Sequence, residues 1–73
     1  MEYRIKKYFN ELDENGYIEI HTREGSFLIT CDDDMEITDN SIVIDGITQG
    51  GKVIDIVPKA KIDYITIRKR DAD

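Results

Sequence analysis

Residues 41–67, SIVIDGITQGGKVIDIVPKAKIDYITI, constrain the fold more than any other part of the sequence. Isoleucine and valine recur there in three short runs, which are separated by a glycine-containing segment and by the only proline, Pro58. Alternating branched apolar residues are typical of half-buried strands, and a proline ends a strand because it lacks an N–H. We therefore expect strands at 41–45, 52–57 and 63–68, a hairpin loop at 46–51, and one short turn at 59–61.

The spacing of apolar residues changes at Gly16. Before it, apolar residues recur at helical spacing, and after it they alternate with polar residues. The first pattern predicts a helix that packs on one end of a sheet, and the glycine is expected to end it. The helix is predicted over residues 1–15, with an apolar stripe formed by Met1, Ile5, Tyr8, Phe9 and Leu12.

Two more strands are expected between the helix and residue 41. The segment YIEIHT (17–22) alternates in character, and Arg23-Glu24-Gly25 after it predicts a tight hairpin turn. The next segment, SFLITCDDDMEI (26–37), is long and changes from apolar to acidic, so we expect a strongly bent strand. Cys31, the only cysteine, is expected to be a small buried hydrophobic residue within that strand.

These elements predict a mainly β, single-domain protein over residues 1–73. The expected fold is an N-terminal helix followed by a small barrel at 17–68, with a tail at 69–73. A barrel is expected because five short, strongly bent antiparallel strands close more easily than they form a flat sheet. A chain of 73 residues buries only roughly 60% of its unfolded surface, so oligomerisation is a natural source of further stability.

The charge of the chain disfavours one class of partner. The net charge is −6, whereas binding to nucleic-acid phosphates depends on lysine and arginine. Acidic residues dominate the middle of the chain, and basic residues gather near its two ends. We also see no membrane-spanning run, no signal peptide and no cysteine pair, which predicts a cytoplasmic protein without a cofactor.

Two segments of the chain resemble the Sm-like proteins, in particular the bacterial Hfq family. They are YFNELDENGYIEIHTREGSFL and KVIDIVPKAKIDYITI, so the resemblance covers roughly residues 8–67. It implies an open five-stranded SH3-like or Sm-like barrel capped by the helix, in which the fourth strand of one subunit pairs with the fifth strand of the next to form a ring. The residues implied at this subunit interface are Val53, Ile54, Ile56, Tyr64, Ile65 and Ile67.

The resemblance is incomplete where that family binds RNA. The family has a Lys-His pair after its fourth strand, where this chain has Pro58-Lys59-Ala60, and an arginine-rich patch where this chain has Asp13-Glu14-Asn15. The base-stacking aromatic residue is also missing from residues 33–40. A fold can persist without its usual function. Lys59 and Lys61 remain as the candidate nucleic-acid or anion site.

An acidic face is the second candidate site. Asp32, Asp34 and Glu36 alternate along the expected strand and would share one face. A calcium loop would need glycine at its sixth position and glutamate at its twelfth, and this sequence has isoleucine and valine there. We expect either a solvated face or a surface for a basic partner. His21, the only histidine, is expected on the surface without a catalytic partner.

These features favour a non-enzymatic protein that self-assembles and acts by binding a protein partner, such as a phage- or prophage-type regulator or inhibitor. Two alternatives remain. The first is an Hfq-like nucleic-acid binder that uses Lys59 and Lys61. The second is an oligomer that binds a small ligand between subunits, with a site built from His21, Lys59 and acidic residues.

Overall fold

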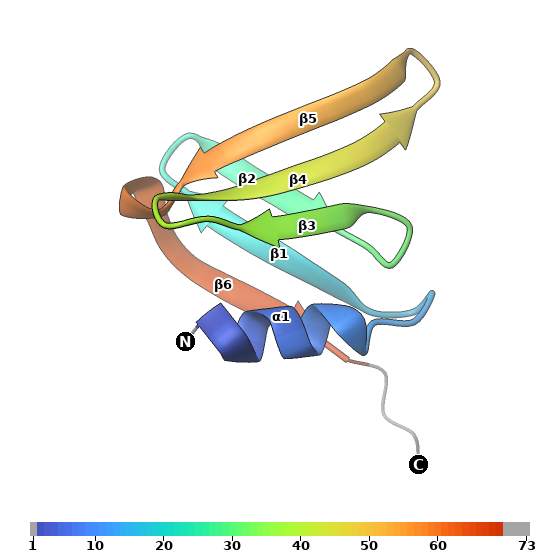
Figure 1. Cartoon of the computed structure of the whole chain (residues 1–73), viewed down its shortest axis with the longest axis horizontal. Coiled ribbons are helices and arrows are strands. Elements are labelled where there is room, and N and C mark those ends of the chain that lie inside the picture. The colour runs from blue at the N-terminus through green and yellow to red at the C-terminus, as the bar shows by residue number, and fades with distance from the viewer. Residues whose placement is uncertain (1, 70–73) are drawn as a thin grey trace.

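The computed structural model describes residues 2–69, with side chains from Arg4 onward (Figure 1). Met1 of the predicted stripe and residues 70–73 of the predicted tail lie outside the described residues. The elements are α1 (Glu2–Asn10), β1 (Tyr17–Thr22), β2 (Gly25–Ile29), β3 (Asp34–Ile37), β4 (Ser41–Thr48), β5 (Gly51–Pro58), the 3₁₀ turn η1 (Lys59–Lys61) and β6 (Ile62–Arg68).

The strands form two antiparallel sheets, with the strand orders β2-β1-β6 and β3-β4-β5. The expected mainly β fold with one N-terminal helix is therefore confirmed. Residues 2–69 hold six strands, not five, and the two sheets do not close into a barrel. β5 and β6 are each paired on one side only, so each forms a free edge of its sheet.

The core lies between the two sheets and is closed at one end by α1 (Figure 1). Its centre is Ile18, Ile20 and Ile29, which are fully buried. The two β1 isoleucines alternate with partly exposed Tyr17 and Glu19, so the predicted alternation is confirmed. The remaining core side chains come from the helix and from the other sheet: Ile5, Met35, Ile42, Ile44 and Val57.

The expected long strand at 26–37 is broken at residues 30–33, which corrects two predictions. The Asp33 carboxylate accepts hydrogen bonds from the Thr30 N–H (2.8 Å) and from the Thr30 hydroxyl (3.3 Å). The Asp33 N–H donates to the Thr30 carbonyl at 3.1 Å, which closes a turn. Cys31 lies in this turn and is exposed, so its predicted burial was wrong.

The helix ends at Asn10, before the predicted stop at Gly16. The Glu11 and Leu12 N–H groups donate back to the last helical carbonyls, and the chain then turns towards β1. Gly16 has a different role from the expected one. A Cβ at this buried position would lie 2.8 Å from the Arg68 carbonyl oxygen, so glycine permits a close approach to the end of β6.

The expected loop at 46–51 is mostly strand. β4 continues to Thr48, and only Gln49 and Gly50 form the turn before β5. The Thr48 hydroxyl stabilises this turn by donating to the Gly51 carbonyl at 3.0 Å and accepting from the Gly50 N–H at 3.2 Å. The result is a long β4–β5 hairpin that projects beyond the other strands (Figure 1). The predicted end of β5 at Pro58 and the short turn after it are confirmed.

Candidate functional site

Exposed apolar side chains concentrate on β5 and β6, two of the four edge strands of the sheets. Of the six large hydrophobic residues that are exposed among residues 4–69, Val53, Ile54 and Ile56 lie on β5 and Tyr64 lies on β6. Ile54 is 55% exposed, Ile56 is 64% exposed, and Tyr64 is 60% exposed. Long, apolar edge strands offer unpaired backbone groups together with side chains that gain from burial.

Ile54 and Ile56 belong to a surface with a defined composition. The β4–β5 register places Ile54 beside Asp45 and Ile56 beside Val43. The β3–β4 register then continues the same two rows to Asp34 and Glu36. We call this outer surface of the β3-β4-β5 sheet the acidic–apolar face; it comprises Asp34, Glu36, Val43, Asp45, Ile54 and Ile56.

Asp45 is the most constrained carboxylate on this face. Its Oδ2 lies 3.4 Å from the Lys52 ammonium, which comes from the opposite strand. Its Oδ1 is buried and has no hydrogen-bond partner among the described residues. The carboxylate is therefore only partly neutralised, which keeps the face negative.

The predicted acidic site is only partly assembled. Asp34 and Glu36 lie on one face of β3 and are exposed, as the alternation predicted. Asp32 lies in the preceding turn, because the strand is broken before it. No group of three or more histidine, cysteine, aspartate or glutamate residues within 2–69 is placed to hold a metal ion.

His21 lies on the outer face of the other sheet. Its ring stacks on Tyr64, with the ring centroids 4.1 Å apart and the planes at 14°. Its Nε2 lies 3.0 Å from the Thr66 hydroxyl and 3.6 Å from a Glu19 carboxylate oxygen. His21 is thus partly covered by its neighbours in β1 and β6, and these contacts assign it a packing role on that sheet.

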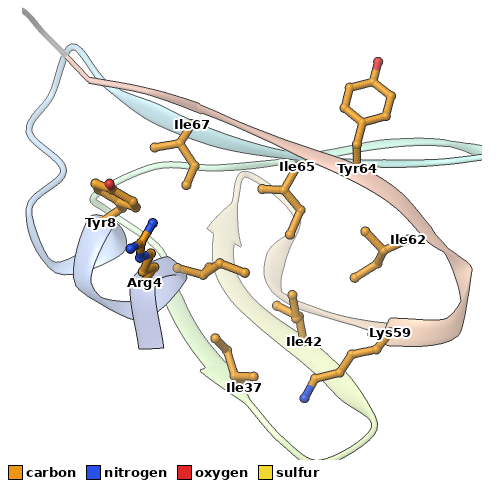
Figure 2. Close-up of a pocket in the computed structure, with 10 residues that line it drawn as sticks. Arg4, Tyr8, Ile37, Ile42, Lys59, Ile62, Tyr64, Ile65 and Ile67 are labelled. Carbon is orange, nitrogen blue, oxygen red and sulfur yellow. The ribbon is translucent and has the colours of Figure 1, made fainter. Parts of the chain in front are cut away.

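A cavity of about 570 Å³ lies between α1, the start of β4, η1 and β6 (Figure 2). Side chains from both sheets point into it, and Ile65 and Ile67 of β6 are among them. These two residues were predicted at a subunit interface, whereas the structure places them on the inner face of their sheet, half-buried. Tyr64 is also among the lining residues, although its ring is directed away from Ile65 and Ile67 (Figure 2).

The two candidate lysines line different hollows. Lys59 is half-buried at the rim of the cavity, and its N–H donates to the Asn40 carbonyl at 2.8 Å. Lys61 is exposed and lines a second hollow, where Glu24 and Asp63 bring negative charge. The structure therefore does not gather Lys59 and Lys61 into one positive patch. Nor does it join His21 to Lys59, since His21 lies on the outer face of its sheet.

One ion pair ties the segment after α1 to the end of β6. The Lys69 ammonium donates to a Glu11 carboxylate oxygen at 2.9 Å. This hydrogen bond lowers the pKa of Glu11 and raises the pKa of Lys69, and the attraction between the two charges acts in the same direction. Lys69 was predicted as the first residue of the tail, but it is held against the domain.

Among residues 2–69, no helix is long and apolar enough to cross a membrane. Two parts of the molecule are thus candidate sites. The first is the edges of β5 and β6 together with the acidic–apolar face, and the second is the cavity beneath β6. Comparison of the chain with protein-family models, curated proteins and solved structures finds no match.

Proposed function

We propose that this chain is a non-enzymatic binding module that assembles through its edge strands β5 and β6 and presents the acidic–apolar face to a basic protein partner. One observation carries the proposal: four of the six exposed large hydrophobic side chains among residues 4–69 lie on β5 and β6, two of the four edge strands. Such strands recruit another strand readily, because backbone hydrogen bonds and apolar burial are gained together.

The two edges are complementary. If β5 of one copy pairs with β6 of another, the outer faces of the two sheets become continuous. Ile54 and Ile56 would then lie beside Tyr64, and all three would lose exposed apolar area. The contact joins two different edges, so it is heterologous and closes into a ring if the rotation per subunit permits.

The element order also supports the Sm-like small barrel. A bent segment at 30–33 links the two sheets, and the single 3₁₀ turn η1 joins β5 to β6. Both sheets pack on one core, and the side of that core beside β6 remains open. If the fold is such a barrel, a neighbouring copy that pairs with β6 extends the β sheet at this open side of the core.

The partner that the acidic–apolar face favours is basic. Asp45 lies beside Ile54, Asp34 and Glu36 continue the same two rows on β3, and the whole chain carries a net charge of −6. Electrostatic complementarity speeds association with positive surfaces and opposes contact between two copies of the same acidic face. Nucleic-acid binding through Lys59 and Lys61 has less support, because these lysines line separate hollows and acidic residues flank one of them.

The assembly is tested by native mass spectrometry of three proteins: the parent, Ile56→Lys and Leu28→Lys. Leu28 is 56% exposed, close to the exposure of Ile56, but it lies on β2, outside the proposed contact. We expect the parent and Leu28→Lys to form the same oligomer and Ile56→Lys to be monomeric. A parent that stays monomeric at high concentration, or equal effects of both lysines, would contradict the proposal.

The partner preference is tested with a synthetic peptide that alternates lysine and valine. The Asp34→Asn/Glu36→Gln variant should bind it more weakly, whereas Asp13→Asn/Glu14→Gln has the same change in net charge outside the face and should bind like the parent. Binding should weaken with added salt. Tight, salt-dependent binding of an RNA oligonucleotide in place of the peptide would favour the nucleic-acid alternative.

A further inference from the structure

We infer that the cavity beneath β6 binds an anionic amphiphile, specifically a linear aliphatic carboxylate. This function is separate from the proposed assembly, because the cavity lies on the inner face of β6, whereas strand addition uses the backbone edge of β6. Its volume of about 570 Å³ is within the range of small-molecule sites.

The cavity leaves apolar side chains partly exposed that a closed core would bury. Four isoleucines that face the cavity are only half-buried, although their positions point towards the core. They come from two strands, β3 and β6, which belong to different sheets, and they converge on the same space (Figure 2). Half-burial of inward-pointing isoleucines means that the chain itself does not cover them, and an apolar ligand would. The four residues are Ile37, Ile62, Ile65 and Ile67.

The charge at the rim specifies the head group. Arg4 and Lys59 line the cavity, and the described residues that line it include no aspartate or glutamate. They enter from opposite sides, Arg4 on α1 and Lys59 on η1, and the Tyr8 side chain lies beside Arg4 (Figure 2). Lys59 makes a further interaction, so the Arg4 guanidinium is the group that favours an anion over a cation or a neutral head group in this chain of net charge −6. A guanidinium is well suited to a planar carboxylate.

The shape of the lining favours a linear tail. Ile62, Ile65 and Ile67 follow β6 along the cavity. At about 3.3 Å per residue this part of the strand extends roughly 16 Å, which accommodates a chain of about ten to twelve carbons. A nucleic-acid phosphate chain would leave the same isoleucines uncovered, so it does not fit this lining.

Calorimetric titration with dodecanoate tests the site, and dodecyltrimethylammonium serves as a probe with the same tail and the opposite charge. We expect saturable binding of one dodecanoate per chain, and binding of the ammonium compound at least about tenfold weaker. Arg4→Gln should weaken dodecanoate binding about three- to fivefold, the effect of one partly exposed ion pair. Lys7→Gln removes the same charge from α1 outside the cavity and should bind like the parent.

A second variant changes the cavity without changing the charge. Ile65→Phe adds volume to the lining and should reduce dodecanoate affinity further than Arg4→Gln, while circular dichroism confirms that the variant is folded. Equal affinity for both head groups, or full dodecanoate affinity in Ile65→Phe, would overturn the inference. Absence of saturable dodecanoate binding would overturn it as well.

The same titration on Ile56→Lys separates this site from the proposed assembly. Dodecanoate binding that persists in Ile56→Lys places the site within one chain, whatever the oligomeric state of the parent. Loss of binding in this variant, with Arg4 and Ile65 intact, would mean that a second copy builds the site and would overturn the inference. The assembly itself is judged by the native masses alone, so either proposal can fail without the other.

Discussion

The outer faces of the two sheets differ in how their side chains are covered. On the β2-β1-β6 sheet, the outward residues contact one another: His21 stacks on Tyr64 and reaches the Thr66 hydroxyl. On the β3-β4-β5 sheet, Ile54 and Ile56 are more than half exposed, and one oxygen of Asp45 has no partner among the described residues. The first face thus has stacking and a hydrogen bond between its side chains, although Leu28 and Tyr64 remain more than half exposed, whereas the second exposes two isoleucines beside a carboxylate oxygen without a partner among the described residues.

The difference originates in the alternation of the strands. β1 places isoleucine inward and polar or aromatic residues outward, as a strand with one buried face does. β5 places Val57 inward and also places two isoleucines outward. A strand that is apolar on both faces usually has both faces covered. The outer face of β5 departs from this rule, and the proposed pairing of β5 with a second copy would cover it.

The largest expected effect contrasts an inner with an outer isoleucine. Ile20→Ala should lower the free energy of unfolding by about 2–5 kcal/mol, because Ile20 is fully buried between the sheets. Ile56→Ala should lower it by less than about 1 kcal/mol in the monomer, because most of that side chain is exposed. Urea denaturation of both variants at a protein concentration below assembly measures the two values.

The two substitutions should have the opposite order of effect on oligomer formation. Ile56→Ala is expected to weaken oligomer formation, and Ile20→Ala to leave it unchanged while the protein remains folded. If Ile56→Ala destabilises the monomer as much as Ile20→Ala does, the outer face of β5 contributes to the fold, and the contrast between the two faces is wrong.

A smaller effect concerns the turn that separates the two sheets. A Cβ on Gly46 would lie 2.7 Å from the Asp33 Oδ1, and that carboxylate is held by the Thr30 N–H. Gly46→Ala should therefore destabilise the fold by about 1 kcal/mol, since the disturbed hydrogen bond outweighs the entropic gain of replacing glycine. Gly50→Ala is the control and should be neutral or slightly stabilising, because its Cβ would meet only the Thr48 hydroxyl oxygen, at an ordinary contact distance of 3.8 Å. Thermal unfolding compares them, and equal stabilities would show that Asp33 moves freely.

Much of the fold follows from alternation and turn residues. The alternation of Ile18 and Ile20, the end of β5 at Pro58 and the short turn after it all have local causes, so the sequence alone predicts them. The break at 30–33 could not be predicted in this way. It depends on one aspartate that bonds back to Thr30, and the continued alternation at Met35 and Ile37 hides it.

The same distinction between local and long-range causes applies to the candidate sites. Ile54 and Ile56 were expected at an assembly edge because of the resemblance, and the structure leaves both exposed on the outer face of β5, whose inner face carries Val57. The cavity was not anticipated, because it requires Arg4, Lys59 and β6 to meet across more than fifty residues of sequence. Ile65 and Ile67 illustrate the difficulty. Alternation shows that they share a face, but it does not show which face is inward.

The smallest expected effect tests the ion pair that closes the β2-β1-β6 side of the molecule. Glu11 has a lowered pKa in the folded state, so its stabilising effect is present above the ordinary value of 4.5 and is lost as the pH falls through the lowered one. Lys69 has a raised pKa, so its effect is present below 10.5 and is lost as the pH rises through the raised value. Glu11→Gln should therefore lower the melting temperature slightly at neutral pH.

Glu14→Gln is the matched control, because it removes the same charge from the same segment outside this ion pair. The difference between the two variants should disappear in acid, once Glu11 is protonated in the parent. A difference that persists below the lowered pKa of Glu11 would assign the stabilisation to packing of the side chain. The charges of Glu11 and Lys69 would then contribute nothing to the stability of the fold.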